Sequence, residues 1–139
     1  MSLPASPSTA PAAPVPMREV LFLVAASREP GQTGNTETLA RRAAAALPPG
    51  VTARWVHLAA LDLPAFVDRR HTTGTYEAPT GDLAMLLEAT LAASDLVVVT
   101  PVYWFSMPTP LKAWLDHWSA FLRVPGLDFK ARMAGKRWW

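Results

Sequence analysis

The 139-residue chain contains no cysteine. This absence excludes disulfides, thiolate metal sites, iron–sulfur clusters and a cysteine nucleophile. Basic and acidic residues nearly balance at a net charge of +2, so the sequence has no basic stripe of the kind that binds nucleic acid. No apolar run approaches the roughly 20 residues that a membrane-spanning helix needs. We therefore expect one globular domain that binds no nucleic acid and does not span a membrane.

The first sixteen residues are rich in Pro, Ala and Ser and carry no charge. They lack the basic and apolar regions of a secretory signal, and such a segment cannot bury enough surface to order itself. We therefore expect a disordered leader over residues 1–16, a folded domain over residues 17–139 and a cytoplasmic location. Met17 directly precedes the first predicted strand and is an alternative start.

Apolar runs and helical periods alternate along the rest of the chain. The runs at 20–26 and 96–100 predict buried strands, and 51–58 predicts a strand nearer an edge. Helices are predicted from the N-cap Asn35 to Leu47, over 83–91 and after Pro108 or Pro110. The inner faces of the first and third helices are expected to carry Leu39, Ala40, Ala43, Ala44 and Leu47, and Leu111, Leu115, Trp118 and Leu122.

This alternation predicts an α/β fold with parallel strands and right-handed crossovers. The fold class expected is a flavodoxin-like, doubly wound parallel sheet with strand order 2-1-3-4-5. Residues 134–139 resemble the approach to a fourth strand. We therefore expect strand 4 to be only begun and strand 5 to be absent from this chain.

The loop after the first strand has the composition of a phosphate-binding loop. Gly31 and Gly34 allow close approach of the backbone, and Asn35 is a predicted helix N-cap. A helix N-terminus offers free N–H groups to an anion. The alternative is an ordinary polar turn before a helix. The candidate phosphate ligands are Ser27, Arg28, Thr33, Gly34, Asn35 and Thr36.

The loop after the third strand is apolar where turn residues would be expected. An extended, proline-anchored loop of this kind suits the flat ring of a ligand. The alternative is that Tyr103, Trp104 and Phe105 pack beneath the following helix as core. The candidate ring contacts are Pro101, Val102, Tyr103, Trp104, Phe105 and Ser106. In a doubly wound sheet, loops after the first and third strands meet at the ligand site, so a phosphate loop and a ring loop together predict an FMN site.

The segment 101–116, PVYWFSMPTPLKAWLD, resembles the flavin loop and following helix of flavodoxin-like NAD(P)H-dependent oxidoreductases, and residues 27–36 resemble their phosphate loop. This group includes NADPH-dependent FMN reductases and NAD(P)H:quinone reductases. The resemblance covers residues 17–139. It implies bound FMN, NADPH or NADH as electron donor, and a homodimer with the ring site completed near the subunit interface.

We therefore expect an FMN-dependent enzyme, an NAD(P)H-dependent FMN or quinone reductase. It would pass electrons to a small-molecule acceptor such as a quinone, a nitro or azo compound, or free flavin. The cofactor carries the chemistry, so no catalytic acid or base is assigned, and no metal site is expected. The alternatives are a non-catalytic flavodoxin-like protein or interaction module without flavin and, with less support, an electron carrier.

Overall fold

The computed structural model describes residues 18–29 and 31–139. The expected leader and Met17 lie outside the described residues. A parallel sheet of order β2-β1-β3-β4 forms the centre of the molecule. Its strands are β1 (Arg18–Val24), β2 (Val51–His57), β3 (Asp95–Val99) and the short β4 (Arg137–Trp138). The predicted order is confirmed for these four strands.

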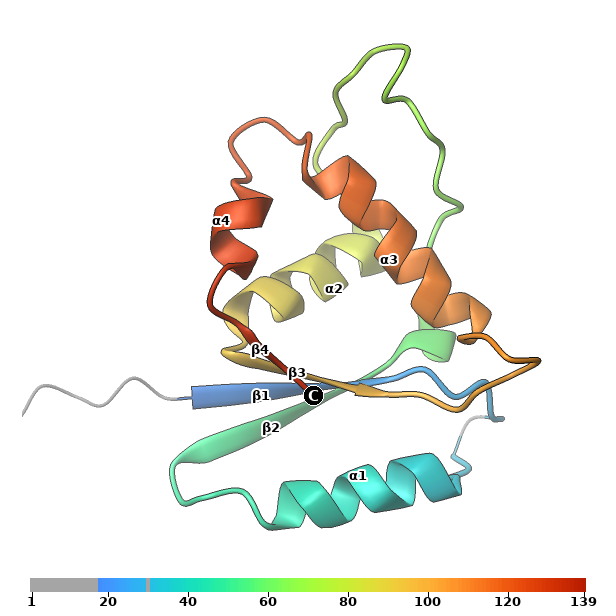
Figure 1. Ribbon diagram of the computed structural model, residues 1–139, viewed down its shortest axis with the longest axis vertical. Coiled ribbons are helices and arrows are strands. Elements are labelled where there is room, and N and C mark those ends of the chain that lie inside the picture. The colour runs from blue at the N-terminus through green and yellow to red at the C-terminus, as the bar shows by residue number, and fades with distance from the viewer. Residues whose placement is uncertain (1–17, 30) are drawn as a thin grey trace, which may run out of the picture.

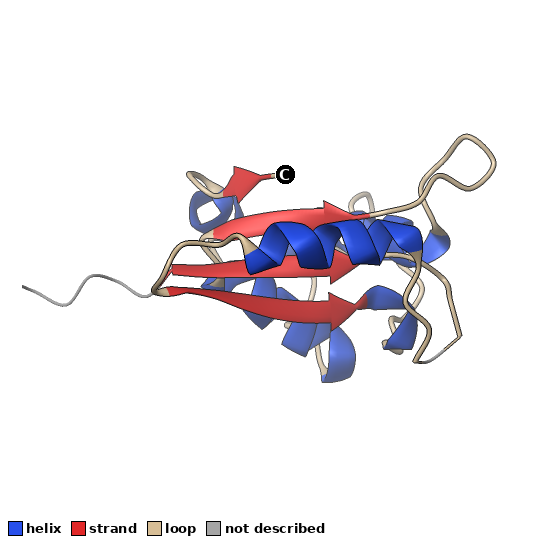
Figure 2. Ribbon diagram, turned by 90° about the horizontal axis from the view of Figure 1, so that it is seen from below, coloured by secondary structure: helices blue, strands red, loops and turns tan. Residues whose placement is uncertain are grey.

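Helices cover both faces of this sheet. Helix α1 (Asn35–Ala45) lies on one face, and α2 (Gly81–Ala92), α3 (Thr109–Phe121) and α4 (Phe129–Met133) lie on the other (Figure 1). A short 3-10 helix, η1 (Leu58–Ala60), follows β2 directly. The strands point the same way, so their carboxyl ends share one edge (Figure 2). The doubly wound α/β fold is thereby confirmed.

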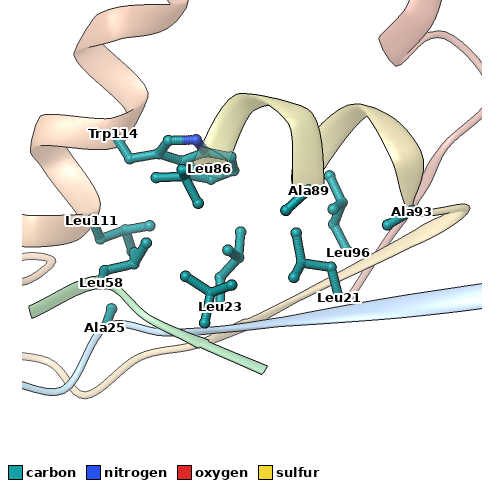
Figure 3. Close-up of a cluster of buried hydrophobic side chains, with 11 residues drawn as sticks. Leu21, Leu23, Ala25, Leu58, Leu86, Ala89, Ala93, Leu96, Leu111 and Trp114 are labelled. Atoms are coloured by element: carbon teal, nitrogen blue, oxygen red, sulfur yellow. The ribbon is translucent and has the colours of Figure 1, made fainter. Parts of the chain in front are cut away.

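Strand β1 shows why the apolar runs of this sequence become central strands. Its alternate residues Leu21 and Leu23 enter a core with α2 and α3, to which Leu86, Leu96 and Trp114 also belong (Figure 3). The residues between them face α1 in a second core. A strand buried on both faces has no polar side, which is why β1 is apolar from Val20 to Val24, where it is buried. The second core contains Val20, Phe22, Val24, Ala40 and Val99.

Two helix faces match the prediction only in part: Ala40 and Ala44 of α1, Leu47 just after it and Leu111 of α3 contact the core as predicted. In α1, Leu39 is 69% exposed and Ala43 is exposed, while Glu37 is buried with Ala40. In α3, Leu122 is exposed. Leu115 and Trp118 pack against the core as predicted, and the fully buried residues of α3 are Leu111, Trp114, His117, Ala120 and Phe121. Both helices contain apolar residues on more than one side, so the period alone did not fix which side turns inward.

A buried carboxylate joins three strands at the amino end of the sheet. Asp95 is fully buried and accepts hydrogen bonds from Arg18 on β1 at 2.7 and 2.8 Å. Arg137 on β4 lies 2.8 Å from it, and Ser94 donates to it at 2.7 Å. The hydrogen bonds from Arg18 hold the pKa of Asp95 well below its usual range, against the opposing effect of burial.

Replacement of this carboxylate, Asp95→Asn, is expected to lower the free energy of unfolding by about 3 kcal/mol, because Arg18 and Arg137 lose a buried counterion. A depressed folded-state pKa contributes stability above the unfolded pKa and loses it as the pH falls. The difference between wild type and variant should therefore be full at pH 7 and shrink below about pH 4. Urea unfolding at several pH values measures it. A difference that stays constant down to pH 2 would contradict this role.

Candidate functional site

The two predicted loops leave neighbouring strands at the same edge of the sheet. Val24 and Val99 are paired at the ends of β1 and β3, and Ala25 N–H donates to the Val99 carbonyl at 2.8 Å. The loop at residues 25–34 and the loop at residues 100–108 both start from this edge (Figure 1). The second strand lies on one side of β1 and the third strand lies on its other side, so the strand order reverses here. Ligands bind at such a switch point in doubly wound folds.

The N-cap of helix α1 is a glycine, not the predicted asparagine. Gly34 is the N-cap, with extended backbone angles of φ −91° and ψ 172°, and its carbonyl accepts from the Thr38 N–H at 2.9 Å. Asn35 is the first helical residue, so the N-cap assignment to Asn35 was wrong. Glycine has no side chain to accept from the first-turn N–H groups of α1. These groups therefore stay available to an external anion.

The Arg28 side chain lies against this glycine. A Cβ placed on Gly34 would overlap Nε of Arg28 and lie 3.0 Å from its Cζ. A guanidinium at the positive end of a helix dipole is unfavourable by itself, but it becomes favourable with an anion held between the two. Only glycine leaves room for this approach. The cap and Arg28 thus form a cradle whose chemistry fits a phosphate.

The remaining residues of the predicted phosphate set are polar and accessible. Ser27, Thr33 and Asn35 are exposed, and Thr36 is half-buried in the first turn of α1. The predicted set thus spans the loop after β1 and the first turn of α1.

The aromatic loop is a tight hairpin that projects from the sheet. Tyr103 and Ser106 exchange two backbone hydrogen bonds, of 2.9 and 3.0 Å, around a turn formed by Trp104 and Phe105. Both turn residues have positive φ, 48° and 60°, a region that side-chain-bearing residues seldom adopt. Backbone strain of this kind is typical of functional sites, at a cost of roughly 1–3 kcal/mol per residue.

The side chains of this hairpin are not core. Trp104 is 94% exposed and Phe105 is 97% exposed, and Val102 is exposed as well, so the alternative of packing beneath α3 was wrong. Val102, Tyr103, Trp104 and Phe105 line an open apolar concavity. Pro101 is half-buried, and the buried Pro108 is the N-cap of α3 at the other end of the loop. The loop is thus anchored at both ends and presents aromatic surface between them.

A further group of residues near α1 was missed by the sequence analysis. Glu37 is buried and accepts hydrogen bonds from Arg41 at 2.9 Å and from His57 at 3.2 Å. Burial opposes the charge of Glu37, but these hydrogen bonds outweigh it and lower the pKa of Glu37. The i, i+4 spacing of Glu37 and Arg41 predicts an exposed helix pair. Nothing in the sequence indicates that His57, from β2, would join them.

The requirements of a metal site and of a membrane-spanning helix can be compared with the described residues. Within residues 18–29 and 31–139, no group of three His, Asp or Glu side chains could hold a metal ion. His117 is buried on α3, and its Nε2 lies 2.7 Å from the Pro64 carbonyl, which is a structural role. No helix in the described part of the chain is long and apolar enough to cross a membrane.

Residues 19–137 match the family model of NADPH-dependent FMN reductases. The chain belongs to this family. FMN and NAD(P)H are the cofactor and the electron donor of the family. YwqN of Bacillus subtilis, which carries the name of an NAD(P)H-dependent FMN-containing oxidoreductase, is 34% identical to this chain over 105 residues. These residues are 75% of this chain and 56% of YwqN. An FMN-dependent NADH:quinone oxidoreductase of Jannaschia sp. is 40% identical over 52 residues, which are 37% of this chain and 26% of that protein.

Solved structures of other proteins share the fold of this chain. The Trp repressor binding protein from Bacillus subtilis superimposes with a TM-score of 0.59 and 26% identity, over 86% of this chain and 58% of that one. The chain thus spans little more than half the length of these two relatives, 56% of YwqN and 58% of the Trp repressor binding protein. The match confirms the flavodoxin-like fold.

Proposed function

We propose that the chain supplies the FMN-binding part of an oxidoreductase that passes electrons from NAD(P)H to a small-molecule acceptor. The acceptor would be a quinone, a nitro or azo compound, or free flavin. The observation that carries the proposal is the cradle of Gly34 and Arg28 at the start of α1, beside an aromatic hairpin on the neighbouring strand. Residues 17–139 would form the domain, with residues 1–16 as a leader.

The phosphate of FMN would lie at the first turn of α1. The N–H groups of this turn and the Arg28 guanidinium would donate to it, and charge-assisted bonds of this kind are about twice as strong as neutral ones. The hydroxyl and amide groups of Ser27, Thr33, Asn35 and Thr36 would complete the set. A single phosphate position with no dinucleotide fingerprint suits FMN better than FAD.

The ring would lie against the loop that follows β3. Pro101, Val102 and Tyr103 provide apolar surface there, and Trp104, Phe105 and Ser106 form the hairpin tip. Bound here, FMN would supply the redox chemistry, with hydride taken from the donor and electrons passed to the acceptor. The chain's part is to bind and orient the ring and to exclude water from one side of it. We further propose a cytoplasmic homodimer in which the exposed hairpin lies near the subunit interface.

The identity of the cofactor tests this proposal. We expect the purified chain to take up one equivalent of FMN and to release it unchanged on acid precipitation. Chromatography against FMN and FAD standards identifies the released flavin. Recovery of stoichiometric FAD, or failure to take up any flavin from an equimolar mixture of the two, would contradict the proposal.

A further inference from the structure

The end of strand β2 lies beside both ends of the loop that contains the phosphate cradle. This loop leaves β1 at Val24 and reaches α1 at Asn35 (Figure 1). In the sheet, His57 at the end of β2 is the register partner of Val24. The His57 side chain also reaches α1, where its Nε2 lies 3.2 Å from Oε1 of Glu37. One residue of β2 thus meets the strand before the loop and the helix after it.

Glu37 belongs to the first turn of α1, and its side chain is buried. A glutamate at the third position of a helix commonly turns back to the N-cap residue. The carboxylate of Glu37 has other partners: Arg41 donates to Oε1 through Nε and Nη2, at 2.9 and 2.5 Å, and His57 donates to the same oxygen. Burial disfavours the charge of Glu37, but these bonds outweigh it and lower its pKa. Glu37 is therefore ionised at neutral pH and holds both partners.

The sheet holds the Arg41 side chain in turn. Its guanidinium lies 4.5 Å from the centroid of the Trp55 ring, and Trp55 on β2 stacks on Phe22 on β1 with centroids 4.2 Å apart. Glu37 is therefore joined to β2 by two routes, one through His57 and one through Arg41 and Trp55. Two contacts at different positions along one strand restrict both the place and the rotation of the first turn of α1.

The two parts of the phosphate cradle lie within the segment that these contacts close. Arg28 follows the end of β1, and Gly34 precedes Glu37 by one helical turn. Because the Arg28 guanidinium occupies the space beside Gly34, a shift of the first turn changes how the guanidinium and the free N–H groups face each other. A preformed site binds its ligand more tightly, since the cost of ordering it is not met on binding.

We propose that Glu37 is a positioning residue for the phosphate of FMN. Its contacts hold the first turn of α1 at the end of β2, so that the phosphate cradle is formed before the flavin binds. Glu37 acts through geometry and not by attraction, because a carboxylate repels a phosphate and the charge of Glu37 is matched by Arg41. The inference rests on the proposed function, in which the cradle binds the phosphate of FMN.

Paired titrations with FMN and riboflavin separate positioning from a general effect on the fold. Glu37→Ala should weaken FMN binding about tenfold and leave riboflavin binding within about twofold, because only FMN carries the phosphate. Glu37→Gln should recover most of the FMN affinity, since its amide oxygen still accepts hydrogen bonds from Arg41 and His57. Adding His57→Ala to Glu37→Ala should cost less than about twofold more, because the two residues act as one contact. The matched control Glu88→Ala, at an exposed position of α2, should bind both flavins as wild type does.

Hydrogen exchange in the flavin-free chain tests the same contacts without a ligand. The Thr38 N–H donates to the Gly34 carbonyl at 2.9 Å and reports on the first turn of α1. In Glu37→Ala it should exchange at least about tenfold faster than in wild type, because the turn opens more often. The N–H of Ala45, in the last turn of the same helix, should exchange at the wild-type rate.

Three results would overturn the inference and leave the proposed function standing. The first is a Glu37→Ala variant that loses affinity for FMN and riboflavin equally, which is a general effect on the fold. The second is a Glu37→Ala variant that binds FMN as tightly as wild type or more tightly, as simple repulsion requires. The third is unchanged exchange at Thr38. A wild-type chain that binds no FMN would instead refute the proposed function, and the role of Glu37 toward FMN with it.

Discussion

Valine in place of Gly34 is expected to lower the affinity of the chain for FMN by about 100-fold, or about 2.7 kcal/mol. The added side chain overlaps Arg28 and displaces its guanidinium from the start of α1. One or two charge-assisted hydrogen bonds to the phosphate are then lost, at roughly 1.5–3 kcal/mol each. Quenching of flavin fluorescence during titration gives the two dissociation constants.

The matched control is Ala43→Val, which adds the same kind of side chain at an exposed position of the same helix. It should leave FMN affinity within about twofold of wild type, while it costs α1 a few tenths of a kcal/mol in helix propensity. If the two variants bind FMN equally, the loop between β1 and α1 is only a turn, and the cradle has no role in binding.

Trp114→Ala is expected to lower the free energy of unfolding by about 4 kcal/mol, whereas Trp104→Ala should change it by no more than about 0.5 kcal/mol. The two residues are the same but their surroundings differ. Trp114 is fully buried and contacts the rings of Trp118 and Trp138, with centroids 5.1 and 6.3 Å away. Trp104 is 94% exposed at the tip of the hairpin.

Urea unfolding of both variants measures the contrast. The FMN affinities of the two folded variants should differ in the opposite sense. Trp104→Ala should weaken FMN binding because it removes aromatic surface from the ring loop, whereas Trp114→Ala leaves that surface in place. A Trp104→Ala variant as destabilised as Trp114→Ala would show that the hairpin packs as core after all.

The sequence was sufficient for the strand order and for the two loops, because these depend on local signals. Apolar runs identify β1 and β3, and glycine with polar residues marks the loop before α1. The aromatic hairpin was also visible, since large apolar side chains directly after a strand are unusual. Its exposure was not predictable, because Trp104 and Phe105 face outward only through a turn with positive φ at both residues.

The features that could not be predicted depend on distant partners. Asp95 looks like the end of a helix in the sequence, but it is a buried carboxylate joined to Arg18 across 77 positions. His57 meets Glu37 only because β2 lies beside β1 and α1 packs over both. The start of α1 was misplaced by one residue, since Asn35 is a favoured cap but Gly34 adopts the required extended angles. The spacing of apolar residues along the sequence does not indicate which distant residues will meet in the fold.

The comparison of FMN with riboflavin tests the central claim most directly. The two flavins share the ring and the ribityl chain and differ only in the phosphate, so the ratio of their affinities isolates the contribution of the phosphate cradle at Gly34 and Arg28. We predict that the wild-type chain binds FMN at least about tenfold more tightly than riboflavin, the effect of one charge-assisted hydrogen bond. Equal affinity for the two flavins, or no measurable binding of FMN, would contradict the account.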